Sequence, residues 1–356
     1  MSDVVVIGGG AIGLSVAWRL RERGAEVTVV DPEPGSGASV VAAGMLAPVT
    51  EAKPGEEALL ALGLESLELW EPFAADLEAA AYRSIGFRSD GTLVVAYDHD
   101  DRRALADMVD RQRSMGLEVG DLTAAHLRTL EPALAPAVRR GADARTERSV
   151  DPPALVAALL VAVETTGVTI VRQKATRLAP GAVTLADGTT LTAPTVVLAA
   201  GAWSADIEGL PPDACPAVRP VKGQIVTLRP RPGDDLVSHV VRAFVRGSIV
   251  YVVPRDDGRV VCGATVEERG WDSIPTAGAV YELLRDVLLV IPGLDDAELL
   301  GVTVGFRPGT PDDLPIIGPS PHVDGLILAT GHYRNGILLT PLTAERVAAA
   351  VLEGVR

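Results

Sequence analysis

The N-terminal segment contains the feature that most restricts what this chain can fold into. Residues 3–31 read DVVVIGGGAIGLSVAWRLRERGAEVTVVD, with a β-branched run at 4–7, an amphipathic run at 11–23 and a second apolar run at 26–30. These patterns predict a buried strand, a helix that ends at Gly24, and a second strand. Gly8, Gly10 and Gly13 fall at the turn between the first strand and the helix.

The GxGxxG spacing in this strand, helix and strand context predicts a dinucleotide site. The first glycine permits a tight turn, the second lets the backbone approach a pyrophosphate, and the third allows helix and strand to pack closely. The helix N-terminus then points at the phosphates. Asp31 ends the second strand, where it can accept hydrogen bonds from a ribose, and an acid there favours FAD or NAD over NADP. A glycine-rich turn that serves only packing is the alternative, and it leaves Asp31 unexplained.

Composition restricts the partners of the chain. The 356 residues are 47% apolar, which predicts two domains with cores of their own. The net charge of -15 argues against nucleic acid and anionic membranes as partners. Cys215 and Cys262 lack metal-ligand spacing, so we expect no metal and two buried thiols. The N-terminus resembles no signal peptide and the run ALVAALLVAV is too short to span a bilayer, so a cytoplasmic location is expected.

Three later segments decide between the two dinucleotides. Residues 35–48 are mostly small, which suits backbone lying against a large flat ligand, although a flexible linker is the alternative. Buried strands are predicted at 195–200 and 326–330, and they lead into Gly201 and Gly331. Strands that converge at one sheet edge with glycine at their ends favour a cofactor larger than NAD.

The motifs together resemble a known family. They are AAGMLAP, VDPPALVAALL, LAAGAWS, YVVPR, GRVVCGATVEERGWD, GFRPGTPDDLPIIG and GHYRNGILLTP, in addition to the N-terminal motif. The chain resembles the D-amino acid oxidase superfamily of FAD-dependent amine oxidases and, within it, the glycine oxidases associated with thiamine biosynthesis. The resemblance covers essentially the whole chain. GFRPGTPD and GHYRNGILL are its most specific parts, whereas the N-terminal motif is common to many flavoproteins.

The resemblance implies an α/β fold with two domains. A Rossmann-like FAD-binding domain is assembled from 1–83, 146–216 and 307–356, and a mixed β-sheet substrate domain from 84–145 and 217–306. The residue patterns agree in outline. Strands are predicted at 91–97, 224–228, 249–253, 260–266 and 302–305, a hairpin turn at 256–258, and charged helices at 101–115 and 276–290.

Three residues are candidates for handling a substrate carboxylate. Arg307, predicted to emerge at the end of the strand at 302–305, carries a guanidinium, which grips a carboxylate bidentately. Tyr251 lies on a predicted strand. The resemblance implies that its hydroxyl binds the substrate carboxylate, and the alternative is a core tyrosine whose hydroxyl is bonded to a backbone carbonyl. Arg334 follows Gly331 and is placed beside the flavin, although an arginine that caps nearby carbonyls is the alternative.

The resemblance also implies a set of FAD contacts. Met45 either lies near the flavin or fills a core gap, and His332 is read as structural although it belongs to the cofactor set. Gly305 stands where sarcosine oxidases attach flavin through cysteine, so FAD is expected to be noncovalent. Arg246, Arg255 and His239 are expected at the solvated surface. The cofactor set is Gly8, Gly10, Ala11, Ile12, Gly13, Asp31, Ala43, Gly44, Met45, Leu46, Ala175, Ala200, Gly201, Trp203, Arg307, Gly331, His332, Arg334, Asn335, Gly336 and Ile337.

The expected reaction is oxidative deamination of a small amine such as glycine, sarcosine or a small D-amino acid. Hydride transfer to flavin gives an imine that hydrolyses, and oxygen becomes hydrogen peroxide. Val266 replaces a methionine of the resembled enzymes, which leaves the preference among these amines open. A dehydrogenase with another electron acceptor and an inactive dinucleotide-binding scaffold are the alternatives. The resemblance also implies a homotetramer.

Overall fold

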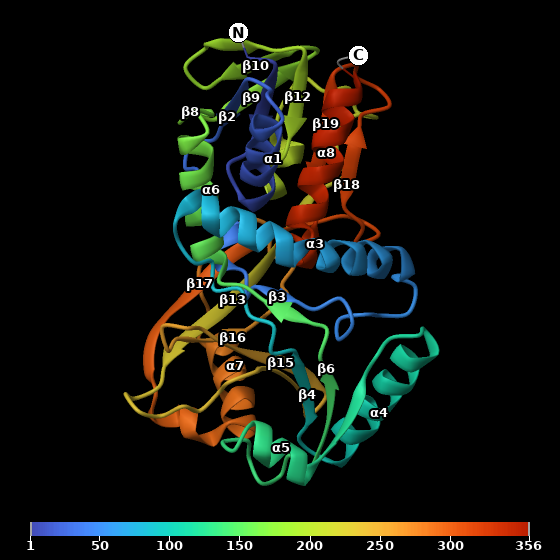
Figure 1. Cartoon of the computed structure of the whole chain (residues 1–356), viewed down its shortest axis with the longest axis vertical. Coiled ribbons are helices and arrows are strands. Elements are labelled where there is room, and N and C mark those ends of the chain that lie inside the picture. The colour runs from blue at the N-terminus through green and yellow to red at the C-terminus, as the bar shows by residue number, and fades with distance from the viewer. Residues whose placement is uncertain (1, 355–356) are drawn as a thin grey trace.

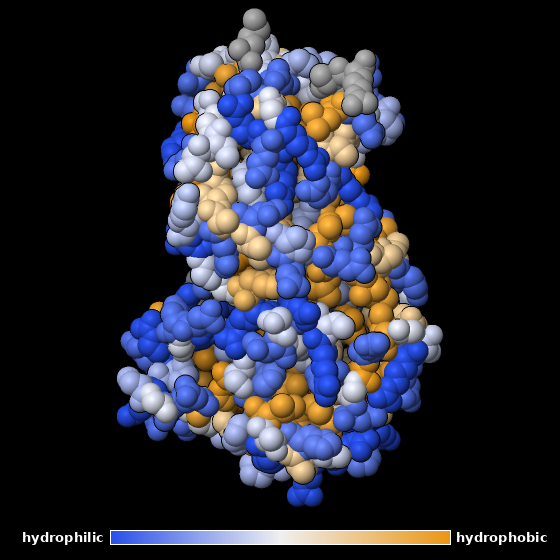
Figure 2. Space-filling model, viewed as in Figure 1, coloured by the Kyte–Doolittle hydropathy of each residue, from blue (hydrophilic) through white to orange (hydrophobic). Residues whose placement is uncertain are grey.

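The chain forms two stacked regions, each built around one large sheet (Figure 1). This arrangement comes from a computed structural model that describes residues 2–354. Both chain ends lie at the top of the upper region, so the chain passes into the lower region and returns. Among the described residues, no helix combines the length and apolar character that crossing a bilayer requires. The face in Figure 2 is mostly hydrophilic, with apolar side chains at the height of α3 (Glu57–Ala81) and in the centre of the lower region.

The upper sheet has six strands in the order β18-β19-β12-β1-β2-β8. All neighbours are parallel except β18 and β19, which are antiparallel. The order places β1, β12 and β19 side by side, so the three strands that precede the glycine turns are adjacent as predicted. The bounds are β1 Val4–Ile7, β2 Val27–Val30, β8 Thr169–Val171, β12 Thr195–Leu198, β18 Ile316–Pro319 and β19 Leu326–Thr330.

Alternating side chains of β1 bury two different faces of the upper sheet. Val4 and Val6 pack with four helices, whereas Val5 and Ile7 pack with a three-stranded sheet. Burial on both faces explains the continuous apolar run in the sequence. The helices are α1 Ala11–Glu22, α3, α6 Pro152–Thr165 and α8 Thr340–Gly354, and the small sheet is β9 Ala175–Ala179, β10 Ala182–Leu185 and β11 Thr190–Thr192.

The lower sheet has eight strands in the order β17-β13-β16-β15-β14-β4-β6-β5. Its neighbours are antiparallel except β14 and β4, which are parallel. Helix α7 (Ala277–Val290) covers one face, and α4 (His99–Ser114) covers part of the other. The strands are β17 Glu298–Gly309, β13 Arg219–Arg229, β16 Val260–Gly263, β15 Ser248–Pro254, β14 Val240–Val245, β4 Thr92–Ala96, β6 Arg140–Ala144 and β5 Gly120–Thr123.

Two predicted strand ends were wrong. Strand β17 continues to Gly309, so Arg307 lies within the strand and not beyond its end. Strand β16 stops at Gly263, so residues 264–266 leave the sheet. The division into domains stays a prediction. The remaining elements are α2 Ala38–Val41, α5 Ala124–Leu130, β3 Met45–Leu46, β7 Arg148–Ser149 and the 3-10 helices η1 Gly201–Asp206, η2 Pro292–Asp296 and η3 Tyr333–Asn335.

A buried carboxyl group holds the loop that follows β3. Glu147 is fully buried and accepts hydrogen bonds from the Thr50 amide at 2.6 Å and the Thr50 hydroxyl at 3.0 Å. The buried Gln112 donates to the Val49 carbonyl at 2.7 Å. Burial raises the pKa of Glu147 to about 7, and the Thr50 hydrogen bonds offset part of that rise. Residues 49 and 50 are thus held by two buried side chains.

The buried state of Glu147 predicts a pH dependence of stability. The folded protein binds this proton more tightly than the unfolded chain, where the carboxyl pKa is near 4.5. The stabilisation is fully present below that value and is lost as the pH rises through about 7. Glu147→Gln lacks this dependence, so its Tm minus the wild-type Tm is expected to increase between about pH 5 and about pH 8. A constant difference would contradict the assignment.

Candidate active site

The glycine-rich turn is packed against backbone on two sides. A Cβ added to Gly8 would lie 2.3 Å from the Ala199 oxygen, and one added to Gly13 would lie 1.9 Å from the Gly8 oxygen. Gly8 also has a φ of 110°, which L side chains rarely adopt. These two glycines therefore allow the turn, α1 and the end of β12 to approach one another closely.

Gly10 differs because the protein itself leaves room beside it. Apart from the two residues that flank Gly10, the described residues bring one atom within 4 Å of a Cβ added there, the Ser39 hydroxyl oxygen at 3.0 Å. That oxygen accepts a hydrogen bond from the Ala11 amide at the start of α1. The helix carries no acidic residue in its first turn, so its positive end stays available to an anion. This cradle fits the pyrophosphate of FAD.

Asp31 is already bonded to backbone amides. Its two carboxylate oxygens accept from the Gly9 amide at 2.6 Å and from the Glu33 amide at 2.7 Å. Each oxygen of a carboxylate can accept a second hydrogen bond, so these contacts leave capacity for a ribose hydroxyl. The ribose contact itself stays a prediction.

The prediction that Arg255 lies at the solvated surface was wrong. Its side chain is buried and donates to the Ala43 carbonyl at 2.5 Å and the Val150 carbonyl at 2.9 Å. Burial lowers its pKa to about 10, and Asp151 opposes the effect. Arg255 thereby fastens the segment at 43–46, which leads into the loop at 47–57, to the start of α6.

His239 is likewise no free surface group. Its ring nitrogen Nδ1 lies 2.7 Å from a carboxylate oxygen of the buried Glu131, and this hydrogen bond raises the pKa of His239. Arg246 fits its prediction better, because its side chain is exposed. Its backbone amide donates to Asp101, and its guanidinium carbon lies 5.9 Å from the centre of the Tyr97 ring. For Arg255, the position at the end of an apolar strand run was the sequence signal that could have predicted its burial.

Tyr251 and Arg307 project from the same face of the lower sheet. Tyr251 is opposite Gly263 on the next strand, and a Cβ there would lie 2.6 Å from the tyrosine ring. A Cβ at Gly223 would lie 2.3 Å from Arg307 Nη1. Two glycines on adjacent strands therefore make room for the two candidate side chains, a role that the sequence analysis missed.

Arg307 and Tyr251 differ in the contacts that their polar atoms make. Arg307 donates from Nη1 to the Thr265 carbonyl at 3.0 Å. Burial raises the pKa of Tyr251 to about 12, and the positive charge of Arg307 counteracts part of the rise. The Tyr251 hydroxyl therefore stays protonated, as a hydrogen-bond donor, across the physiological range.

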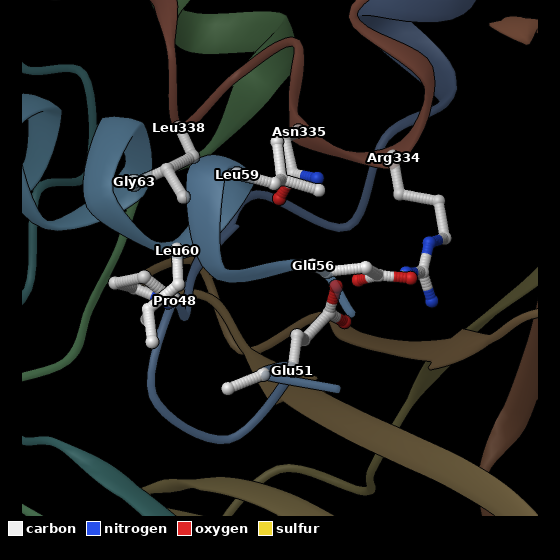
Figure 3. A pocket seen from close by; sticks show the side chains of 10 residues that line it. Pro48, Glu51, Glu56, Leu59, Leu60, Gly63, Arg334, Asn335 and Leu338 are labelled. Atoms are coloured by element: carbon white, nitrogen blue, oxygen red, sulfur yellow. The ribbon is translucent and has the colours of Figure 1, made fainter. Parts of the chain in front are cut away.

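Arg334 enters the same part of the molecule from η3. Its Nη2 lies 3.7 Å from a Glu56 carboxylate oxygen, and its buried Nε has no hydrogen-bond partner in the described part of the chain. Figure 3 shows Arg334, Glu56 and Glu51 pointing toward one end of a small pocket. η3 packs against β17, which carries Arg307. The lining of the pocket is Pro48, Glu51, Ala52, Glu56, Leu59, Leu60, Gly63, Arg334, Asn335 and Leu338.

Arg242 and Glu51 are site residues that the sequence analysis missed. Arg242 is 8% exposed and lies directly opposite Tyr251 in the pairing of β14 with β15. Its Nη1 lies 3.0 Å from a Glu51 carboxylate oxygen. An arginine inside the apolar run at 240–245 was the available signal, but its partner is 191 positions away in sequence.

The other predicted cofactor residues have definite surroundings. Trp203 stacks on Trp271 with ring centroids 4.9 Å apart. Gly331 has a φ of 74°, and a Cβ there would lie 2.6 Å from Thr310. His332 is buried and hydrogen-bonded to Thr343, consistent with a structural role. The FAD contacts of this set stay predictions, as they do for the partly or fully buried Ala11, Ile12, Ala43, Gly44, Met45, Leu46, Ala175, Ala200, Gly201, Asn335, Gly336 and Ile337.

Comparison with known proteins places the chain in a family. A family model described as FAD dependent oxidoreductase matches residues 3–350. The glycine oxidase of Geobacillus kaustophilus is 34% identical over 98% of this chain and 92% of its own length. The crystal structure of glycine oxidase from that organism has a TM-score of 0.90 at 32% identity, covering 99% of this chain and 95% of its own.

Two further relatives differ in length or name. The bifunctional protein ThiO/ThiG of Trichormus variabilis is 33% identical over 99% of this chain but 53% of its own length, so the chain spans about half of that protein. The crystal structure of iminodiacetate oxidase from Chelativorans sp. BNC1 has a TM-score of 0.86 at 29% identity, covering 98% of this chain and 95% of its own. By the family match and the full-length relatives, the chain belongs to the FAD dependent oxidoreductases, and FAD is its cofactor.

Proposed function

We propose that the protein is an oxidase of glycine and related small amines, including sarcosine and small D-amino acids. The observation that carries this proposal is Arg307. Within residues 2–354 it has carbonyl partners but no carboxylate ion-pair partner, and it lies on the same sheet face as the Tyr251 hydroxyl. A guanidinium with spare donors beside a phenol donor suits one substrate carboxylate.

The residues bind and orient the substrate. Arg307 would hold the carboxylate, and Tyr251 would donate a second hydrogen bond to it, which fixes the α-carbon. When bound, FAD supplies the two-electron acceptor for oxidation of the carbon–nitrogen bond. The acids near the site, Glu51 and Glu56, are each paired with an arginine. Because both of these acids are paired, neither is free to act as a base, and the substrate amine would have to react unprotonated.

The products follow from this chemistry. A primary amine becomes an imine that water hydrolyses to ammonia and a 2-oxo acid, glyoxylate in the case of glycine, and sarcosine releases methylamine in place of ammonia. Oxygen takes the two electrons and two protons as hydrogen peroxide. The similarity to ThiO/ThiG supports the further proposal that glycine imine from this enzyme supplies the thiazole of thiamine. A cytoplasmic location and a homotetramer stay predictions from sequence.

The flavin is proposed to be noncovalent. A side chain at Gly305 would approach Val41 of α2 to 2.9 Å, so the structure leaves no room for a cysteine there. Cys262 is fully buried in the core beneath the opposite sheet face, packed with α7. Flavin that stays with the protein after acid precipitation would contradict the proposal.

Oxygen consumption with glycine tests the proposed reaction. We expect one hydrogen peroxide and one glyoxylate for each oxygen consumed, measured with an oxygen electrode before and after catalase is added. The dehydrogenase alternative predicts that glycine reduces an artificial dye without consuming oxygen. A protein that does neither would not be an amine oxidoreductase.

Tyr251→Phe is expected to weaken substrate binding without changing the pH profile. Loss of one hydrogen bond to a charged carboxylate raises KM for glycine about ten- to a hundred-fold, with little change in kcat. The pKa of Tyr251, about 12, lies above the range in which the amine titrates. Steady-state kinetics across that range should therefore show the same rise in kcat/KM for both proteins. A rise that disappears in the variant would assign the ionisation to Tyr251.

A further inference from the structure

Three guanidinium groups border the candidate substrate site. Arg307 and Arg334 were expected there, and Arg242 is the third. Directly opposed residues of an antiparallel pair share one sheet face, so Arg242 lies beside Tyr251 on the side away from Gly263. The charges of Arg242, Glu51 and Arg307 all act on the Tyr251 hydroxyl, which places the four groups in one electrostatic environment.

Two of these three positive charges are neutralised by the protein. Arg242 lies 3.0 Å from Glu51, and Arg334 lies 3.7 Å from Glu56. Among residues 2–354, Arg307 forms no such ion pair. The arrangement therefore leaves one unpaired cation, which matches a substrate with one carboxylate.

Glu51 is held against Arg242 by the loop that carries it. The preceding residue, Thr50, donates both its amide and its hydroxyl to the buried Glu147, and the Val49 carbonyl accepts from Gln112. These hydrogen bonds fix the backbone beside Glu51. A second anion from solution would therefore have to compete with a carboxylate that is already in place.

Arg242 would bind such an anion if Glu51 were neutral. Its Nε is buried and has no hydrogen-bond partner among residues 2–354, and a guanidinium can bind a carboxylate with two parallel hydrogen bonds. Neutralising Glu51 would leave a buried, unpaired guanidinium next to Tyr251, and such a group attracts anions strongly in a low-dielectric site.

We propose that Glu51 determines substrate specificity by occupying Arg242, so that the site rejects amines that carry a second carboxylate. This inference rests on the proposed function. It concerns the residues that set which amine is accepted, whereas the proposed function concerns how a single carboxylate is held.

N-ethylglycine and iminodiacetate form a matched pair for the test, because they differ in one methyl group that is replaced by a carboxylate. Wild-type holoenzyme is expected to have a kcat/KM for iminodiacetate at least about tenfold below that for N-ethylglycine, since like charges placed together disfavour binding. Glu51→Gln is expected to raise the ratio of kcat/KM for iminodiacetate to kcat/KM for N-ethylglycine about tenfold or more. The double variant Glu51→Gln with Arg242→Gln should return the ratio to a low value.

Glu65→Gln is the matched control, because Glu65 also pairs with an arginine, Arg346, but at an exposed position on α3. Its ratio should equal that of the wild type. A wild type that prefers iminodiacetate, or a Glu51→Gln ratio that does not change, would overturn the inference. The flavin spectrum of each variant shows whether the holoenzyme has folded.

A binding measurement separates this inference from the proposed function. Oxydiacetate and ethoxyacetate have the same shapes as the two amines but cannot be oxidised at nitrogen, and their binding is followed through the flavin absorption band. Glu51→Gln should lower the Kd of oxydiacetate relative to the Kd of ethoxyacetate about tenfold. If neither amine is turned over, the proposed function fails, but the change in relative Kd still tests whether Glu51 excludes a second carboxylate. If N-ethylglycine is oxidised but neither ratio moves, the inference alone fails.

Discussion

Arg307→Ala is expected to lower kcat/KM for glycine by about a hundred- to a thousand-fold. Truncating one partner of a hydrogen-bonded charge pair costs several kcal/mol, because the other charge is left unpaired. In this site the loss is large because Arg242 and Arg334 are already paired with acids and cannot replace the missing cation. Steady-state kinetics with glycine, and the Kd of an unreactive carboxylate such as acetate, would measure the loss.

Two variants make the Arg307 result specific. Arg307→Lys keeps the charge but loses the bidentate geometry, so it should fall between the wild type and Arg307→Ala. Arg229→Gln removes an exposed cation from the neighbouring strand β13 and should leave kcat/KM unchanged. If Arg307→Ala retained wild-type kcat/KM and acetate affinity, the carboxylate site would have to lie elsewhere.

Gly10→Val is expected to abolish FAD binding while leaving the protein folded. Apart from the Ser39 hydroxyl and the two flanking residues, the part of the chain that the structure describes has no atom within 4 Å of a Cβ at this position, and the Gly10 φ of -82° is allowed for valine. The added side chain would instead occupy the cradle proposed for the pyrophosphate. The ratio of flavin absorbance to protein, and the Kd for added FAD, would show the loss.

Gly278→Val is the matched control for this experiment. Gly278 lies in α7, and beyond its chain neighbours and the backbone of that helix, residues 2–354 place no atom within 4 Å of a Cβ added there. The control should keep one FAD per chain, and far-ultraviolet circular dichroism should show that both variants are folded. A folded Gly10→Val protein with a full complement of FAD would place the pyrophosphate away from this turn.

The N-terminal prediction succeeded because its information is local. The turn at Gly8, Gly10 and Gly13, the helix and the two strands all lie within residues 3–31, and each element follows from the pattern of its own residues. The three strands that precede the glycine turns are neighbours in the sheet, as was expected from the crevice rule for parallel strands.

The missed residues depend on contacts between distant segments. Arg242 becomes a site residue because β14 pairs with β15 and because a loop nearly two hundred positions earlier brings Glu51 to it. Arg255 is buried because its partners are carbonyls at 43 and 150. Side-chain periodicity within one strand shows which residues share a face, but not which acid from another segment covers that face.

The same reason explains the two glycines that flank the site. Gly223 and Gly263 read as ordinary strand glycines in sequence. Only the register across β13, β16 and β15 shows that a side chain at either position would collide with Arg307 or Tyr251. A glycine in a strand often marks the close approach of another group, and here that group is a candidate site residue.

Amine oxidase activity is tested by the visible spectrum of the purified protein, recorded without oxygen before and after glycine is added. We expect a flavin absorption band that glycine bleaches and that returns when air is admitted. A flavin band that is left unchanged by glycine, sarcosine and D-alanine would contradict the proposed oxidase activity, although the FAD-binding fold would stand.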